Sequence, residues 1–161
     1  MFRGDGATRT ESRGLSWLLV FLVAVVGVGA MIGIACAPDD WYRQLAKAPF
    51  NPPDWVFGPV WFALYVFLAL SGWLVWMRAP RDRAMVIWML QMLVNLLWPP
   101  TFFVLHMVWT PLALVGAMIV LTAVLFPRAR RVDPWAGWCL APYMAWLIYS
   151  AVLNGWVALA N

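Results

Sequence analysis

The chain has 161 residues, of which 65% are hydrophobic and 11% are charged, and a chain of this length cannot bury that much apolar surface in a water-soluble core. The net charge of +4 does not indicate a nucleic-acid partner, because the basic residues stand at the ends of apolar segments instead of sharing one face. The composition therefore predicts an integral membrane protein.

The first two elements in chain order are a polar tail and an apolar segment. We expect residues 1–14 to form a short disordered tail and residues 15–35 to form a membrane-spanning helix, since about 20 apolar residues cross the hydrocarbon layer. A cleaved signal peptide is the alternative, because arginines precede the segment and residues 35–37 resemble a cleavage site. The apolar run exceeds that of a signal peptide, and Pro38 would follow the cut, which favours a retained helix.

A connection rich in Pro and Trp follows at residues 36–56. Four further spans are predicted at residues 57–77, 84–105, 111–126 and 135–158, with basic turns at residues 78–83 and 128–133 and another turn at residues 106–110. The predicted fold class is all-α. A single domain over residues 15–161 forms a bundle of five transmembrane helices, with a structured loop between the first two.

The basic residues orient this bundle. On one side of the membrane lie nine arginines, namely Arg3, Arg9, Arg13, Arg78, Arg81, Arg83, Arg128, Arg130 and Arg131. The other side has only Arg43 and Lys47. The positive-inside rule therefore predicts a cytoplasmic N-terminus, with the 36–56 loop and the C-terminus facing outward.

The residues that commonly bind metals or form disulfides are few and far apart. Cys36 and Cys139 stand at opposite ends of their spans, so we expect no disulfide. The only histidine, His106, has no nearby carboxylate in the sequence, so we expect no metal site. We interpret His106 as an interfacial residue at a helix end, with a haem ligand as the alternative. Asp and Glu are absent from the five spans, which argues against ion-coupled transport.

Polar and aromatic residues recur at helical spacing on three spans. The second span carries Phe57, Trp61 and Tyr65, the third carries Gln91, Asn95, Trp98 and Phe102, and the fifth carries Trp146, Ser150 and Asn154. Polar side chains in hydrocarbon face protein or a cavity, so we expect these stripes to converge. Hydrogen bonds between helices are one explanation for a single stripe. An aromatic ligand pocket explains all three together.

The loop at residues 36–56 is stiff and apolar for a solvated connection. Pro49, Pro52 and Pro53 fix backbone angles, and four aromatic side chains lie among them. Such a loop suits a lid over the mouth of the bundle, and a loop lying in the lipid interface is the alternative.

Three segments of the sequence resemble one known family. They are WYRQLAKAPFNPPDWVFGPVW, NLLWPPTFF and PYMAW followed by LN, and together they resemble the TspO/MBR family over about residues 15–156. The resemblance implies a five-helix bundle in a bacterial membrane, a lid formed by the first loop, a pocket for porphyrins and a homodimer. It places the pocket at Tyr42, Pro52, Phe57, Trp61, Tyr65, Asn95, Trp98, Trp146 and Ser150.

Two features depart from the family pattern. Ser150 stands where the family usually has Ala, and its hydroxyl would hydrogen-bond a ligand or narrow the cleft. The C-terminal GWVALAN lacks the basic residue of a cholesterol-recognition pattern, which weakens a sterol partner. Gly29 and Gly33 form a GxxxG pair, which serves either a dimer or packing within one chain.

The leading functional hypothesis is a membrane receptor or sensor that takes a porphyrin or similar flat tetrapyrrole as ligand, possesses no cofactor, and contributes to transport or regulation of that ligand. The alternative is an enzyme that degrades porphyrin with light or an oxidant, using Trp61 and Trp146 as redox-active groups. A small transporter is a third hypothesis. Asn95 is expected to orient the polar edges of the ligand.

Overall fold

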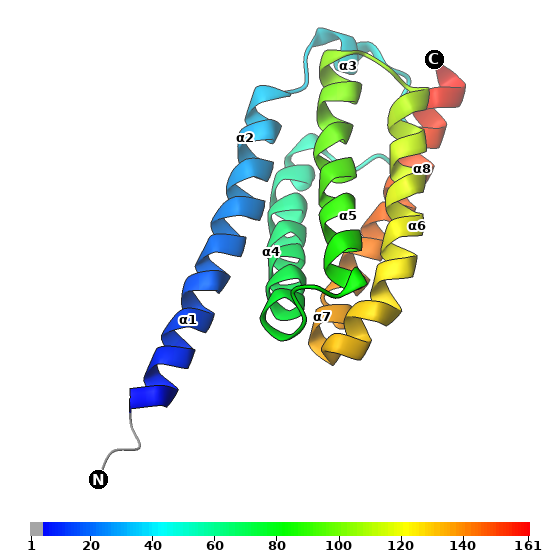
Figure 1. The fold of residues 1–161 in the computed structure, drawn as a ribbon. Helices are drawn as coiled ribbons and strands as arrows, with labels where there is room; N and C mark the ends of the chain where they lie inside the picture. The colour runs from blue at the N-terminus through cyan, green and yellow to red at the C-terminus, as the bar shows by residue number, and fades with distance from the viewer. Residues whose placement is uncertain (1–4) are drawn as a thin grey trace.

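The computed structural model describes residues 5–161, and over that range the chain is a bundle of helices (Figure 1). Five helical segments are long and apolar enough to cross a membrane: Gly14–Ala35, Asp54–Arg78, Arg83–Val104, Trp109–Val132 and Pro134–Ala160. The predicted five-helix membrane bundle is therefore confirmed.

The helices follow one another through short connections. The first span comprises α1 (Asp5–Leu22), a π-helical turn η1 (Val23–Gly27) and α2 (Val28–Ala35), and the second is α4 (Asp54–Arg78). The third comprises α5 (Arg83–Pro99) and the π-helical η2 (Pro100–Val104), and the fourth is α6 (Trp109–Val132). The fifth comprises α7 (Pro134–Trp138) and α8 (Leu140–Ala160), while the short α3 (Asp40–Gln44) lies in the first loop.

Two boundaries differ from the sequence-based expectation. Helix α1 begins at Asp5, so residues 5–14, expected in a disordered tail, are helical, and residues 1–4 lie outside the described part. The apolar segment that follows nucleates the helix, so extending this helix towards the N-terminus by a few turns costs little free energy.

The second difference concerns residues 127–132, which continue α6 although a turn was expected from Arg128 onward. Pro127 contributes no backbone N–H to the carbonyl of Ala123, four residues earlier, and the Arg128 side chain donates a hydrogen bond to the neighbouring Val124 carbonyl at 2.8 Å. Arg130 and Arg131 occupy the last turn, where cations interact favourably with the negative end of the helix dipole.

The core is formed where α4, α5, α6 and α8 face one another. Leu68, Leu125, Leu140 and Leu147 are almost completely buried there, and α6 packs along both α5 and α8. Helix α1 packs against α4, and the two ribbons run side by side in Figure 1. Large apolar side chains such as Val120 and Leu159 are exposed on the outside of the bundle, as lipid contact requires.

Polar contacts fasten the end of the bundle where α1 begins, which we call the inner end, as opposed to the outer end that carries the first loop. Arg78 at the end of α4 forms an ion pair of 2.6 Å with Asp133, whose side chain is 1% exposed. Asp133 also caps α7, accepting a hydrogen bond of 2.7 Å from the backbone N–H of Trp135. The Ser71 hydroxyl donates to the Ala136 carbonyl at 2.8 Å. These bonds close the inner end, whereas the opposite end contains a cavity.

Candidate ligand-binding site

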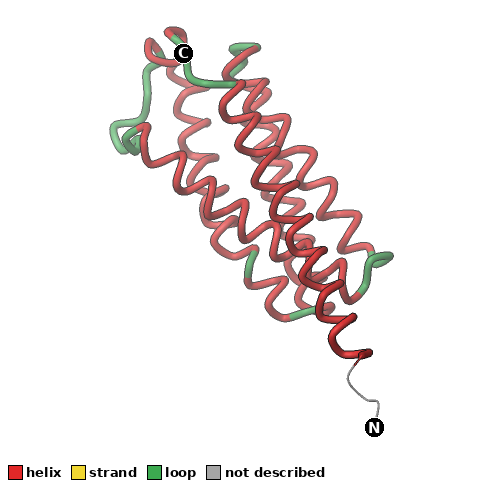
Figure 2. The backbone as a smooth tube through the Cα atoms, turned by 90° about the vertical axis from the view of Figure 1, so that its left-hand side faces the viewer, coloured by secondary structure: helices red, strands yellow, loops and turns green. Residues whose placement is uncertain are grey.

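A cavity of about 550 Å³ occupies the outer half of the bundle. Its lining residues come from the first loop and from all five spans, and most of them are apolar. Single residues from the two ends of the sequence, such as Gly33 of α2 and Val157 of α8, share this one space. In the tube view of Figure 2, the first loop and the C-terminus lie at this same end of the molecule. The volume falls within the range of small-molecule sites.

Seven of the nine residues that the sequence placed in a pocket line this cavity. They are Tyr42, Phe57, Trp61, Tyr65, Asn95, Trp98 and Ser150. The stripes on the second and third spans therefore face one common space, except that Gln91 does not line it. Contact of these residues with a ligand remains a prediction.

Pro52 and Trp146 are not among the lining residues. The backbone carbonyl of Pro52 accepts a hydrogen bond of 2.9 Å from the Asn51 side chain, which does line the cavity. The Trp146 ring meets the Phe57 ring edge-on, with centroids 5.9 Å apart. Its indole N–H is buried, and it has no hydrogen-bond acceptor in the described part of the chain. Phe57 therefore stands at the cavity wall, with Trp146 packed against it.

Aromatic rings form two sides of the cavity. On the third span, Trp98 stacks on Phe102 with centroids 5.2 Å apart and planes inclined by 17°. On the second span, Trp61 lies 5.5 Å from the ring of Tyr65. The Pro99–Pro100 pair begins the π-helical turn that carries Phe102 and Phe103. The Thr101 hydroxyl donates to the Leu97 and Trp98 carbonyls at 3.0 and 2.8 Å, stabilising this turn.

A chain of hydrogen bonds forms the inner floor of the cavity. Tyr65 donates its hydroxyl to Asn95 Oδ1 at 3.0 Å, and Asn95 Nδ2 donates to the Tyr143 hydroxyl at 2.9 Å. Gln91 Nε2 also donates to Tyr143, at 2.6 Å. Gln91, Asn95 and Tyr143 are at most 2% exposed. Polar groups buried at membrane depth need such partners.

These bonds change the expected role of Asn95. Its amide hydrogens are engaged by Tyr143 and, at 3.7 Å, by the sulfur of Met118, so Asn95 holds the floor together within the bundle. Only its already bonded oxygen remains to accept a ligand group. Tyr143, the second partner in this network, was not identified as a site residue, although the PYMAW segment contains it.

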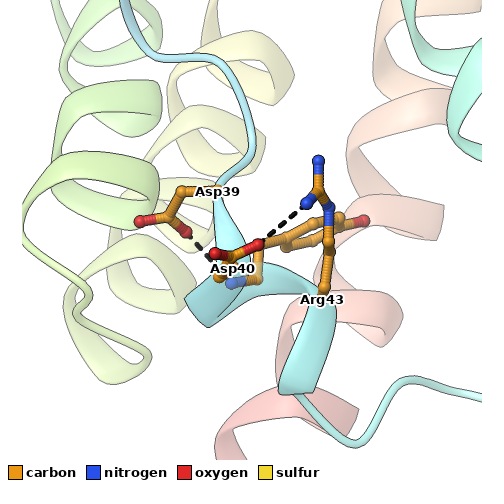
Figure 3. Close-up of polar contacts among 4 residues, drawn as sticks. Asp39, Asp40 and Arg43 are labelled. Carbon is orange, nitrogen blue, oxygen red and sulfur yellow. Dashed lines mark hydrogen bonds and ion pairs between the residues drawn. The ribbon is translucent and has the colours of Figure 1, made fainter.

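The first loop begins with a capped helical turn. Asp39 accepts a hydrogen bond of 3.1 Å from the backbone N–H of Tyr42, and this bond caps α3 (Figure 3). The backbone bond, followed by the contact with His106, holds the pKa of Asp39 below its ordinary value. Both side chains of the Asp40–Arg43 ion pair, which lie 2.8 Å apart, are exposed, so this pair contributes little to stability. Burial, together with the negative charge of Asp54, raises the pKa of Tyr42.

The loop is attached to two other spans, the third and the fifth. His106, at the end of the third span, lies 2.9 Å from Asp39 and stacks on Trp41 with centroids 4.5 Å apart. Asn161 at the C-terminus exchanges two hydrogen bonds with the backbone of Ala46, and the Tyr149 hydroxyl donates to the Phe50 carbonyl at 2.9 Å. These contacts favour a lid over a loop lying in the lipid interface.

The structure also shows where the histidine and the two cysteines lie. His106 does not line the cavity, which disfavours the haem-ligand alternative. Its φ of 53° lies in the left-handed region, which the Asp39 and Trp41 contacts help to stabilise. Cys36 lines the cavity and Cys139 lies at the start of α8, and both are free thiols.

Comparison with known proteins places the chain among described membrane proteins. The model of the TspO/MBR family matches residues 18–159. A tryptophan-rich sensory protein of Cereibacter sphaeroides is 33% identical over 141 residues, covering 87% of this chain and 89% of that protein. A translocator protein of Ovis aries is 36% identical over 122 residues, covering 71% and 70%. Protein CrtK of Rhodobacter capsulatus is 33% identical over 153 residues, covering 87% and 89%.

Proposed function

Because the chain belongs to the TspO/MBR family of integral, multi-pass membrane proteins, we propose that its cavity binds a porphyrin or a similar flat tetrapyrrole. In this proposal the protein is a membrane sensor that contributes to handling or transport of the ligand. The names of its relatives, a sensory protein and a translocator protein, fit such a role.

The observation that carries the proposal is the combination of aromatic walls with an apolar interior. Trp61 and Trp98 stand on different spans and line the same cavity, so a flat ring system would contact an indole from each span. The floor residues bond to one another and offer few free donors to the interior of the cavity. A broad, flat and mostly apolar molecule suits this lining better than a sugar or a nucleotide does.

The first loop would control exchange of the ligand. Its attachments to His106, Tyr149 and Asn161 are individual polar contacts at the protein surface, which open more readily than the packed core. Release of these contacts would open the outer end, and binding energy shared between loop and bundle would favour closure.

A light- or oxidant-dependent degradation of porphyrin is the second candidate, and the pairing of Trp61 with Tyr65 favours it. Both side chains are oxidisable, both line the cavity, and their rings are 5.5 Å apart. The indole of Trp61 would be close enough to a photoexcited porphyrin in the cavity to donate an electron to it. Trp146, packed against Phe57, would act one step further from the ligand.

Titration of the purified protein with protoporphyrin IX tests both candidates. The proposal predicts saturable binding at micromolar concentrations, seen as a shift of the porphyrin absorbance band and as quenching of tryptophan fluorescence. A spectrum that stays constant in light and in darkness supports a sensor, and a band that is lost only under illumination supports the enzyme. Absence of saturable binding contradicts both.

A further inference from the structure

The charged residues of the cavity are confined to its outer mouth. Among the described lining residues, Lys47 from the loop carries the positive charge and Asp54 from the first turn of α4 carries the negative charge. The inner part is lined mainly by apolar side chains, together with uncharged polar groups such as the hydrogen-bonded Tyr65 and Asn95. A charged group on a ligand therefore meets its complement only at the mouth, because burying it deeper leaves it unpaired.

Lys47 has no acidic partner in the described part of the chain. The ion pairs found there are Arg43–Asp40, Arg78–Asp133 and His106–Asp39, and none includes Lys47. Its ammonium group instead lies 4.2 Å from the centre of the Tyr42 ring. A cation held over an aromatic ring keeps its hydrogen-bond donors available for an anion.

The surrounding contacts hold Lys47 in place. The preceding residue, Ala46, is bound through its backbone N–H and carbonyl to the Asn161 side chain, at 3.0 and 3.3 Å. Tyr42 is buried and packs edge-on against Phe102 and Phe103, with centroids 6.1 and 5.4 Å apart. The ammonium group is thus positioned by the C-terminus on one side and by the third span on the other.

We propose that Lys47 binds a carboxylate on the edge of the ligand, so that the site selects free-acid tetrapyrroles over neutral ones. This inference rests on the proposed function. The acid lies at the mouth beneath the loop, beside Lys47, and the apolar body of the macrocycle extends inward between Trp61 and Trp98. Asp54, which also lines the mouth, repels a second acid there.

The test compares protoporphyrin IX with two neutral porphyrins, its dimethyl ester and etioporphyrin, which has no acid groups. The wild-type protein at low salt should bind the free acid about tenfold tighter than either neutral compound, as one charge-assisted contact provides. Lys47→Gln should remove this difference and leave the affinity for the neutral porphyrins unchanged. Lys47→Arg should restore most of the preference.

Arg43→Gln is the matched control, because Arg43 is the other basic residue of the same loop and does not line the cavity. This variant should keep the preference for the acid. Retained binding of the neutral porphyrins shows that the variants are folded. In the wild-type protein, raising the ionic strength should weaken binding of the free acid but not of the ester.

Equal affinity of the wild-type protein for acid and neutral porphyrins overturns the inference and leaves the proposed function standing. A Lys47→Gln variant that weakens all three ligands alike also overturns it, because Lys47 then only supports the loop. Failure of the wild-type protein to bind any of the three overturns the proposed function and the inference with it.

Discussion

Gly29 brings the first span close to the wall of the cavity. A methyl group at this position would overlap the ring of Tyr65, whose hydroxyl bonds to Asn95 on the floor. Gly33, one turn further along the same helix, also lines the cavity but has no atom within 4 Å of such a methyl group. The two glycines of the GxxxG pair therefore differ, because only Gly29 is needed for close packing within one chain. A dimer face that includes Gly33 remains an expectation.

Substitution at these two glycines should have opposite results. Gly29→Ala forces Tyr65 to move and should lower the free energy of unfolding by about 1–3 kcal/mol, the usual cost of overpacking. Gly33→Ala should be neutral or stabilising by up to about 1 kcal/mol, since Ala favours a helix over Gly. Thermal unfolding in detergent, with and without protoporphyrin, measures both. Equal melting temperatures for the two variants would contradict the close contact between Gly29 and Tyr65.

Tryptophan substitutions separate binding from redox chemistry. Trp61→Phe keeps a flat ring in the cavity and should cost about 1–2 kcal/mol of porphyrin affinity. Trp146→Phe should change the affinity less, because the lost indole N–H has no acceptor in the described structure and the ring lies outside the lining. Fluorescence titration measures the affinities, and illumination of the complexes measures conversion.

Unaltered photoconversion in the Trp61→Phe variant would rule out Trp61 as the electron donor. Asn95→Ala should weaken binding and unfolding stability together, because it removes the centre of the floor network. A selective loss of conversion in that variant, with binding intact, would contradict the assignment of Asn95 to the floor.

At the scale of the element, the loop with α3 depends on a single carboxylate. Asp39 caps α3 and contacts His106, and its pKa in the folded protein lies below the ordinary value of 3.8. A depressed pKa means that the ionised form stabilises the closed loop. This contribution is complete above the unfolded pKa, begins to decrease as the pH approaches 3.8, and is lost below the folded pKa.

Acidification through this window should therefore loosen the loop. Limited proteolysis with an acid-active protease should cut residues 41–55 faster as the pH falls below about 4. Asp39→Asn should be cut readily at all pH values, with a flatter pH dependence. Asp40→Asn is the control, because its exposed pair with Arg43 contributes little, and it should behave as the wild-type protein does. A steep pH dependence that persists in Asp39→Asn would assign the effect to another group.

Sequence periodicity predicted the helices themselves well and predicted less accurately which of their residues line the cavity. The whole stripe of the second span lines the cavity, the third-span stripe does so except for Gln91, and the α8 stripe does so except for Trp146. Trp146 instead packs against the Phe57 ring, a contact between helices that the spacing on α8 alone does not encode. Pro127 and Arg128 resembled a helix end, although α6 continues through both of them to Val132.

At the scale of the whole molecule, the five spans and their order followed from hydropathy and charge alone. The contacts that assemble the site did not. Asn161 binds Ala46, which is 115 residues distant in sequence, and Tyr143 joins the floor from a span 48 residues beyond Asn95. Such pairings depend on how the helices pack, and no local pattern encodes them. The cation of the site, Lys47, entered the sequence argument only through its place in the charge count.

The orientation of the bundle is a prediction for the intact membrane. In a background lacking Cys36 and Cys139, an impermeant thiol reagent added outside cells should label Asp40→Cys and not Arg81→Cys. Arg81 is chosen because it is exposed and leaves intact the cap that Asp82 forms on α5. Labelling of Arg81→Cys alone would reverse the topology and place the loop in the cytoplasm.

The affinity of two α8 variants for protoporphyrin IX shows whether the ligand occupies this cavity. Ser150 lines the cavity, whereas Ile148, on the same helix, is 54% exposed on the outside of the bundle. Ser150→Phe fills the site with a ring and should weaken binding by about tenfold or more, while Ile148→Phe should bind as the wild-type protein does. Wild-type affinity in Ser150→Phe would contradict the account, because the porphyrin would then bind outside this cavity.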